Sequence, residues 1–361
     1  MERSHKFNLV IVIGFFLSVA FLGIPATEAN KHQTSKFLYT SQPSGTDEPK
    51  NYKTIVNYPD SQSTIAFTEQ PTDYKKEIYL SPDRKAFAVT VESPEAYGQI
   101  STYITDVNGR RLTSLHLGSF VSWSPDSNTV LLFLADNQNV SGRAIYLLSK
   151  DDEYRNSALP VGTISADISP ADGATAYSVT LAGTDQSELR IKMLEGADKT
   201  LIKDTNQTFA WLRWSPKGDK IAFLALNLGQ PFPNRDLVII NLDGTTVRRI
   251  SNIVWNYPPV WSPDGDHLVF ARQDDNNPIS NLNNFELLSS NLWEYSILKN
   301  SENKLTNFNN AKTIHPAYST DGLEIIFISN ESGSDQVWMK NKTDLYSLTN
   351  SDDLKSYPIL P

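Results

Sequence analysis

The chain has 361 residues, of which 39% are hydrophobic, so it can bury one large core or two ordinary ones. Its formal net charge of -9, without any run of lysine or arginine, argues against a phosphate-backbone binder, so we expect no nucleic-acid partner. Because the sequence contains no cysteine, disulfides, cysteine zinc sites, thiolate nucleophiles and a lipid-modified N-terminal cysteine are excluded.

The first 29 residues have the three-part pattern of a secretory signal. Arg3 and Lys6 precede an apolar run at residues 9–24, and Thr27 and Ala29 provide small residues for a cleavage site. The run is short for a membrane-spanning helix, which needs about 20 residues. Residues 1–29 are predicted to be a signal peptide, with an N-terminal membrane anchor as the alternative. Either way, we expect an exported protein that is periplasmic, extracellular (secreted) or anchored to the outer face of the cytoplasmic membrane.

The next segments lead into the folded domain. Residues 30–50 are polar and rich in turn-forming residues, which predicts a linker with one candidate strand at residues 37–40. Residues 52–69 then have the pattern of a single β-hairpin. We assign residues 51–361 to one folded domain.

A turn motif recurs six times along the rest of the chain. Proline presets the turn, aspartate caps it, glycine accepts a positive φ, and the apolar run that follows returns as a strand. A spacing of 43 to 57 residues between copies is typical of propeller blades. The copies read LSPDRKAFAV, WSPDSNTVLLF, ISPADGATAYSV, WSPKGDKIAF, WSPDGDHLVF and YSTDGLEIIF, with their serines at positions 81, 124, 169, 215, 262 and 319.

Each repeat also contains a second hairpin, clearest at residues 236–251. Four strands make one blade, and because a four-stranded sheet cannot bury both faces alone, the blades must stack around an axis. Residues 356–361 resemble an innermost strand cut off before its turn. Together with the hairpin at residues 52–69, they favour an all-β propeller of seven four-stranded blades, the seventh closed by both termini. The alternative is a six-bladed propeller whose terminal strands augment an outer edge.

The recurring Ser-Pro-Asp-Gly turn followed by an IAF-type strand resembles the WD40-like PD40 repeat of the TolB-like propeller family, over about residues 52–361. The same repeat occurs in the propeller of prolyl-oligopeptidase-type peptidases. The resemblance implies a propeller fold. We expect the propeller only, without the N-terminal α/β domain of TolB and without a peptidase domain. The contacts of TolB with a peptidoglycan-associated lipoprotein and colicins are therefore not carried over to this chain.

Motifs for chemistry are missing from the sequence. It has no G-x-G-x-x-G, G-x-S-x-G, P-loop or H-E-x-x-H pattern. Outside the signal and linker there are three scattered histidines, His116, His267 and His315, too few for a convincing metal cluster. The histidine-rich metal centre of pectate-degrading propeller lyases, which resemble this repeat family, is not visible either. We therefore expect no catalytic residue, no metal site and no cofactor.

Residues that recur in the repeats are predicted to be structural. Asp264 stands at the turn position of its sister aspartates, so we expect it to cap the turn. Trp123, Trp214 and Trp261 share one repeat position, which favours packing between blades, with ligand stacking as the alternative. His267 stands where sister repeats have lysine or threonine, which indicates a solvated position without a specific role.

Function is expected where the repeats differ. By analogy with other propellers, the connections between the second and third strands (b–c) and between successive blades (d–a) form the binding face. Two b–c connections on adjacent blades are long, at residues 226–236 and 272–291, and either could instead be a solvated insertion. The candidate binding residues there are Trp255, Tyr257, Arg272, Asp274, Asp275 and His315.

This mixture of aromatic, amide and acidic groups suits a carbohydrate or an extended peptide. We expect a monomeric, non-catalytic propeller that binds a protein or peptide partner, or an envelope glycan, at this face. The first alternative is a carbohydrate-active hydrolase or lyase at the channel mouth, using carboxylates such as Asp236, Asp274 and Glu286. The second is a partner subunit or sensor ectodomain on a retained N-terminal helix. Calcium at Asp274 and Asp275 is a weaker alternative, because their spacing is not that of an EF-hand.

Overall fold

The computed structural model describes residues 37–42, 53–58, 61–65, 75–93, 99–134, 144–181, 183–184, 186–193, 195–227, 235–254, 257–273, 289–350 and 354–360. All regular structure in these residues is β-strand. Among them there is no helix long and apolar enough to cross a membrane. The predicted signal or anchor, residues 1–29, lies outside the described residues.

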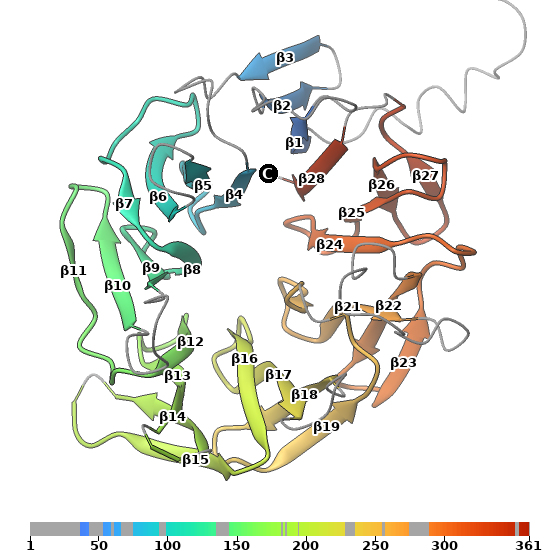
Figure 1. Ribbon diagram of the computed structural model, residues 1–361. Coiled ribbons are helices and arrows are strands. Elements are labelled where there is room, and N and C mark those ends of the chain that lie inside the picture. Colours follow the sequence, from blue (N-terminus) through green and yellow to red (C-terminus); the bar gives the residue numbers. More distant parts are fainter. Residues whose placement is uncertain are drawn as a thin grey trace, which may run out of the picture.

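The fold is a ring of antiparallel sheets around a common axis (Figure 1). We use "blade" for a sheet of four consecutive strands, numbered in chain order. Blades 1 to 3 are β4 (Lys75–Leu80), β5 (Ala86–Ser93), β6 (Gln99–Asp106) and β7 (His116–Leu117); β8 (Ser119–Trp123), β9 (Thr129–Leu134), β10 (Ala144–Ser149) and β11 (Tyr154–Asn156); and β12 (Thr163–Ile168), β13 (Thr175–Thr180), β14 (Ser187–Lys192) and β15 (Lys199–Asp204). Blades 4 to 6 are β16 (Gln207–Trp214), β17 (Lys220–Asn227), β18 (Arg235–Asn241) and β19 (Thr246–Ile250); β20 (Val260–Trp261), β21 (His267–Gln273), β22 (Ser290–Ser296) and β23 (Ser301–Lys304); and β24 (Thr313–Tyr318), β25 (Ile325–Ser329), β26 (Gln336–Lys340) and β27 (Leu345–Ser347).

One further four-stranded sheet joins the two ends of the chain. It has the strand order β28 (Leu354–Ile359), β1 (Phe37–Gln42), β2 (Lys53–Tyr58) and β3 (Ser61–Ile65). Its strand β1 includes residues 37–40, where the sequence pattern predicts a strand within the linker. The chain ends thus form a sheet of their own, which we call the composite sheet, and do not extend the outer edge of a neighbouring blade.

The predicted blade count needs a correction. The described residues contain six blades of consecutive strands, whereas the sequence pattern favours seven blades. The composite sheet lacks the Ser-Pro-Asp-Gly turn and is assembled from both chain ends. Its physical role follows from strand pairing: β28 and the β1–β3 hairpins each leave edge hydrogen-bonding groups that the other satisfies.

Each Ser-Pro-Asp-Gly turn is closed by the serine side chain. In blade 5, Ser262 Oγ donates to Asp264 Oδ1 at 2.5 Å and accepts from the backbone N–H of His267 at 2.9 Å. Gly265 has a φ of 70°, in the left-handed region. The hydrogen bond from Ser262 keeps the pKa of Asp264 below its ordinary value. The prediction that Asp264 caps the turn is therefore confirmed, and half-buried His267 contributes its backbone amide to this turn.

The recurring tryptophans lie between blades, as their shared position predicts. All three are buried, and each indole Nε1–H donates to a backbone carbonyl on the first strand of the preceding blade. The bonds run from Trp123 to Tyr79 (3.0 Å), from Trp214 to Asp167 (3.1 Å) and from Trp261 to Arg213 (3.2 Å). A buried indole N–H needs such an acceptor, so the tryptophan fixes both the spacing and the height of adjacent blades.

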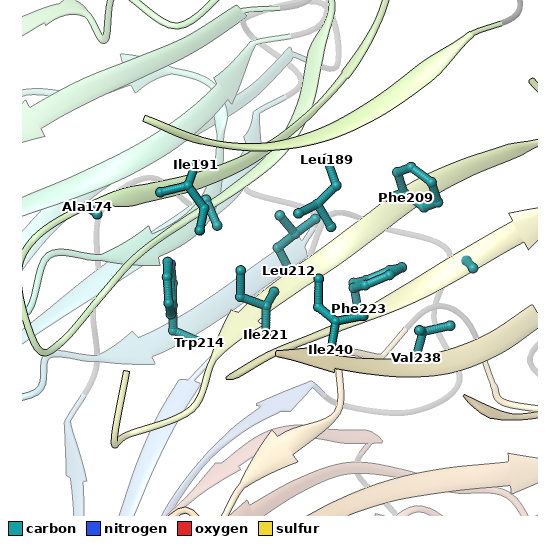
Figure 2. Packing of buried hydrophobic residues seen from close by; sticks show 12 residues of the cluster. Ala174, Leu189, Ile191, Phe209, Leu212, Trp214, Ile221, Phe223, Val238 and Ile240 are labelled. Atoms are coloured by element: carbon teal, nitrogen blue, oxygen red, sulfur yellow. The ribbon is translucent and has the colours of Figure 1, made fainter. Parts of the chain in front are cut away.

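The hydrophobic core is divided into clusters between blades. Figure 2 shows the cluster between blades 3 and 4, where Leu189 and Ile191 lie opposite Phe223 and Ile240. These side chains are at most 3% exposed. Truncating a buried phenylalanine such as Phe223 to alanine typically costs about 3–5 kcal/mol. Because every sheet is covered by its neighbours, the ring must close for the first and last blades to be buried.

The end of β28 provides this closure. Leu360 is 3% exposed and packs in the blade 6 cluster with Ile314 and Ile326, while Ile359 packs against the blade 1 cluster. The backbone carbonyl of Leu360 also accepts a hydrogen bond from Arg84 Nη1 at 3.3 Å. Two consecutive residues therefore contact the blades on both sides of the closure.

Candidate functional site

The b–c and d–a connections of blades 4 and 5 meet at the same end of the ring, which we call the loop face. Three backbone hydrogen bonds tie them together: Ile253 N–H to Arg235 O (3.2 Å), Val254 N–H to Ala271 O (3.0 Å) and Gln273 N–H to Asn252 O (2.9 Å). The segment 252–254 therefore lies between the start of β18 and the end of β21. The attachment points of both long b–c connections consequently lie beside one d–a connection.

Three of the six predicted binding residues fall outside the described residues: Trp255, Asp274 and Asp275. Of the other three, Tyr257 and His315 lie together. Their ring centroids are 4.3 Å apart at 65°, an edge-to-face arrangement, and both residues are half-buried. Tyr257 precedes the first strand of blade 5 and His315 lies on β24, so the pair joins two adjacent blades at their inner edge.

His315 has an unusual backbone conformation. Its φ is 53°, a left-handed value that bulky side chains rarely adopt. It lies in a β-bulge, because the pairing between β24 and β25 shifts between Ile314 and Ala317. Bulges and strained residues concentrate at functional sites, where they orient a side chain out of the regular pleat.

Trp211 has the same conformation two blades earlier. Its φ is 55°, and it lies in the bulge of β16, where the pairing with β17 shifts between Ala210 and Arg213. Trp211 and His315 both stand four residues before the serine of their turns, Ser215 and Ser319. Trp211, Tyr257 and His315 thus belong to the inner edges of three successive blades. Sequence reasoning missed Trp211. An alignment of the repeats on their serines places Trp211 at the position equivalent to His315.

Two side chains from blade 3 hold the bulged strand β16. Ser165 Oγ accepts from the backbone N–H of Leu212 at 3.1 Å, and Asp167 Oδ2 accepts from that of Trp214 at 2.7 Å. Asp167 also accepts a hydrogen bond from Ser122 Oγ of blade 2. These side chains provide acceptors for N–H groups on an edge strand, and so they constrain the backbone within the bulge and directly after it.

Asp167 is a buried carboxyl group, 8% exposed. Burial raises its pKa, and the charge of Arg213 and the hydrogen bonds from Ser122 and the Trp214 amide only partly oppose this effect. Sequence reasoning also missed Asp167, which precedes the turn motif and is not part of it.

Arg272, the third described candidate, is directed elsewhere. It lies near the end of β21, where its guanidinium group is 4.5 Å from the ring centroid of Trp293 and Nη2 bonds Glu302 at 2.5 Å. Its side chain is 19% exposed. Arg272 thus packs on the sheet surface of blade 5, in an ion pair with the outermost strand.

Of the three carboxylates considered for catalysis, one lies among the described residues. Asp236 is 8% exposed and forms an ion pair with Arg249 Nη1 at 2.7 Å, while Asp274 and Glu286 lie outside the described residues. In the part of the chain that the structure describes, no group of three or more histidine, aspartate or glutamate side chains could hold a metal ion.

Comparison with known proteins defines the class of fold. No protein-family model matches the sequence. No curated protein matches it either. Oligogalacturonate lyase from Vibrio parahaemolyticus is similar in structure, with a TM-score of 0.56 and 11% identity over 84% of this chain and 91% of that chain. Prolyl oligopeptidase B from Galerina marginata has a TM-score of 0.55 and 11% identity, over 92% of this chain and 53% of that chain.

TolB from Acinetobacter baumannii is also similar, with a TM-score of 0.49 and 18% identity over 96% of this chain and 70% of that chain. At 11% identity, the likeness to the lyase and the peptidase shows the fold alone. The protein is an all-β propeller of four-stranded sheets. Membership of the TolB-like family remains a resemblance carried by the repeat motif.

Proposed function

We propose that the protein is an exported, non-catalytic β-propeller that binds a protein or peptide partner, or an envelope glycan, through the loop face and the inner edges of blades 4 to 6. The observation that carries this proposal is the left-handed conformation of two large residues, Trp211 and His315, at equivalent bulges. Such a conformation costs about 1–2 kcal/mol per residue, so its occurrence at two large residues supports a role beyond folding.

The chemistry of these side chains suits binding. Trp211, Tyr257 and His315 are each half-buried, which leaves part of each residue accessible to a ligand. Trp211 and Tyr257 pack against core clusters, and the ring of His315 packs against Tyr257. Aromatic rings stack on the apolar face of a sugar or on peptide side chains, and indole and imidazole groups also form hydrogen bonds. A rigid edge-to-face pair such as Tyr257 and His315 loses little entropy when a ligand binds.

Export is proposed from the N-terminal pattern, with its basic start, apolar run and small residues before position 30. Under this proposal the mature chain acts as a monomer in the periplasm or outside the cell, and any contact with the membrane is made through the N-terminal segment. Sequencing the N-terminus of the exported protein distinguishes cleavage after residue 29 from a retained anchor.

The binding test compares two histidines. Purified wild-type chain, His315→Asn and the control His267→Asn are immobilised, and each is exposed to an envelope extract and to a glycan array. We expect His315→Asn to weaken capture of the partner about tenfold, the loss of roughly one good contact. His267 lies at the opposite end of a blade, so the control should match the wild type.

The result that would contradict the proposal is equal capture by both variants. Turnover of an oligosaccharide by the purified chain would instead support the carbohydrate-active alternative, and loss of that turnover in Asp274→Ala would locate the activity in the long b–c connection.

A further inference from the structure

Two arginines share one carboxylate on the outer rim between blades 4 and 5. Glu302 on β23 accepts from Arg248 Nη2 of β19 at 2.6 Å and from Arg272 Nη2 of β21 at 2.5 Å. Figure 1 shows β19 and β23 on the outside of the ring, on neighbouring blades. One negative charge therefore faces two positive charges.

Aromatic rings hold both guanidinium groups in place. Arg272 lies 4.5 Å from the ring centroid of Trp293 and 5.5 Å from that of Phe270, and Arg248 lies 5.9 Å from that of Tyr295. Cation–π contacts of this kind restrict the guanidinium group and leave its edge available for hydrogen bonds. The side chain of Arg248 is 41% exposed, so the cluster is open to solvent on the blade 4 side.

Both arginines also have buried donors without acceptors. The Nε atoms of Arg248 and Arg272 are buried, and no hydrogen-bond partner is present for either among the described residues. Buried polar groups are nearly always hydrogen-bonded, so a pair of orphaned charged donors at one place indicates a missing acceptor. Each arginine uses only Nη2 toward Glu302, whereas a guanidinium group can hold an oxyanion through two adjacent N–H groups.

The pKa shifts of Glu302 and Arg248 favour the charged form of both groups. Burial by itself would raise the pKa of Glu302, but its hydrogen bonds to Arg248 and Arg272 and their charges outweigh burial and lower it. The hydrogen bond to Glu302 raises the pKa of Arg248. Glu302 and Arg248 are therefore charged at neutral pH, and a single carboxylate faces two guanidinium groups.

The neighbouring Arg249 forms an ion pair in which one arginine faces one carboxylate. Arg249 follows Arg248 on β19, pairs with Asp236 at 2.7 Å and approaches Gln207 Oε1 at 3.4 Å. It has its own carboxylate, and its Nε is not among the buried atoms that lack a partner. Arg248 and Arg272 differ from this neighbour in sharing one carboxylate between two guanidinium groups and in having buried Nε donors without a partner.

We propose that Arg248 and Arg272 form an oxyanion-binding site, which takes a carboxylate or sulfate group beside Glu302 with Trp293 as its apolar floor. The oxyanion accepts from the donors that Glu302 leaves unused and neutralises the second guanidinium charge. This site lies on the rim between two blades. It does not depend on the partner proposed for the loop face, so either proposal can fail without the other.

The test measures sulfate and acetate binding by calorimetry at constant ionic strength, with chloride as the balancing anion. We expect Arg248→Gln to weaken sulfate binding about tenfold or more, since a hydrogen bond to a charged group contributes roughly 1.5–3 kcal/mol. The matched control Arg249→Gln should bind as the wild type does. Stronger binding of acetate than of sulfate would identify a carboxylate as the preferred group, and the reverse order would identify sulfate.

A second variant distinguishes a binding site from a purely structural ion pair. Glu302→Gln removes the competing carboxylate, so we expect tighter sulfate binding and a sulfate-dependent rise in Tm larger than that of Arg249→Gln. General salting-out by sulfate affects every variant alike and cancels in this comparison. Equal sulfate binding by wild type, Arg248→Gln and Arg249→Gln would overturn the proposal, whatever the folding of Glu302→Gln.

Discussion

The two ends of the propeller differ in how strictly they follow the repeat. At the turn end, the serine and aspartate of blades 1, 2, 5 and 6 form the same hydrogen bond, from Ser Oγ to Asp Oδ1, at 2.5–2.6 Å. At the loop face, the connections differ in length, and Trp211 and His315 adopt strained conformations. The regular turn end positions each blade. The loop face can therefore contain residues whose conformations do not favour folding.

The largest loss of stability is expected from a substitution that disrupts packing between the turns at the regular end. Gly218→Ala would place a Cβ 2.5 Å from the Cβ of Ala171 on the preceding blade, at a φ of +67°. Strain and overpacking together predict a loss of about 3 kcal/mol in the free energy of unfolding, measured by urea denaturation.

The matched control for this variant is Gly196→Ala. Gly196 also has a positive φ, +100°, but a Cβ there would meet nothing within 4 Å, so only the strain of about 1 kcal/mol is expected. If both variants lose the same stability, close packing between successive turns contributes nothing and the comparison of the two ends fails.

The next effect removes one turn cap. Ser262→Ala deletes the hydroxyl that donates to Asp264 and accepts from the His267 amide. Leaving these groups without their partner should cost about 1.5 kcal/mol in unfolding free energy. Ser251→Ala, at an exposed position in the preceding connection between blades 4 and 5, should change stability by less than about 0.5 kcal/mol. Indistinguishable midpoints would show that the serine does not stabilise the turn.

A smaller effect depends on pH. Because burial raises the pKa of Asp167, the folded state retains this proton to higher pH than the unfolded state, whose pKa is about 3.9. The contribution of Asp167 to stability is therefore greatest below that value and falls as the pH rises toward the folded pKa, by about 1.4 kcal/mol for each unit of elevation.

Asp167→Asn removes this dependence. The stability of the variant relative to wild type should rise as the pH is raised from about 4, because the asparagine cannot ionise and can still accept from the Trp214 amide. Urea denaturation across this pH range provides the measurement. A relative stability that falls with pH would mean that the carboxylate is stabilised by its neighbours and that its pKa is lowered.

The smallest change in stability is expected at the loop face, where His315 has a strained backbone. Asparagine tolerates a left-handed φ better than histidine, so His315→Asn should relieve about 1 kcal/mol of strain. Loss of the ring contact with Tyr257 offsets part of this gain, which leaves a net stabilisation of about 0.5 kcal/mol. Calorimetric Tm values of this variant and of His267→Asn provide the comparison. A lower Tm for His315→Asn would show that the histidine is kept for stability rather than for binding.

Much of the fold was predictable because it depends on local chemistry repeated six times. Asp264 and the three tryptophans take the predicted positions, since a turn and a buried indole each need a specific partner that every repeat supplies. The candidate site was less predictable. The pairing of Tyr257 with His315 joins residues far apart in sequence, and Arg272 is diverted to Glu302 by a contact that no local pattern encodes.

The sequence by itself determined the repeat: where each turn lies, which residues cap it, and that four-stranded sheets must stack around an axis. These features follow from backbone preferences and from the period of the apolar residues, both of which act over a few neighbouring positions. Only the tertiary structure decided how the chain ends pair in the composite sheet, which bulges carry Trp211 and His315, and which carboxylate two arginines share. Each of these depends on which blades become neighbours once the ring has closed.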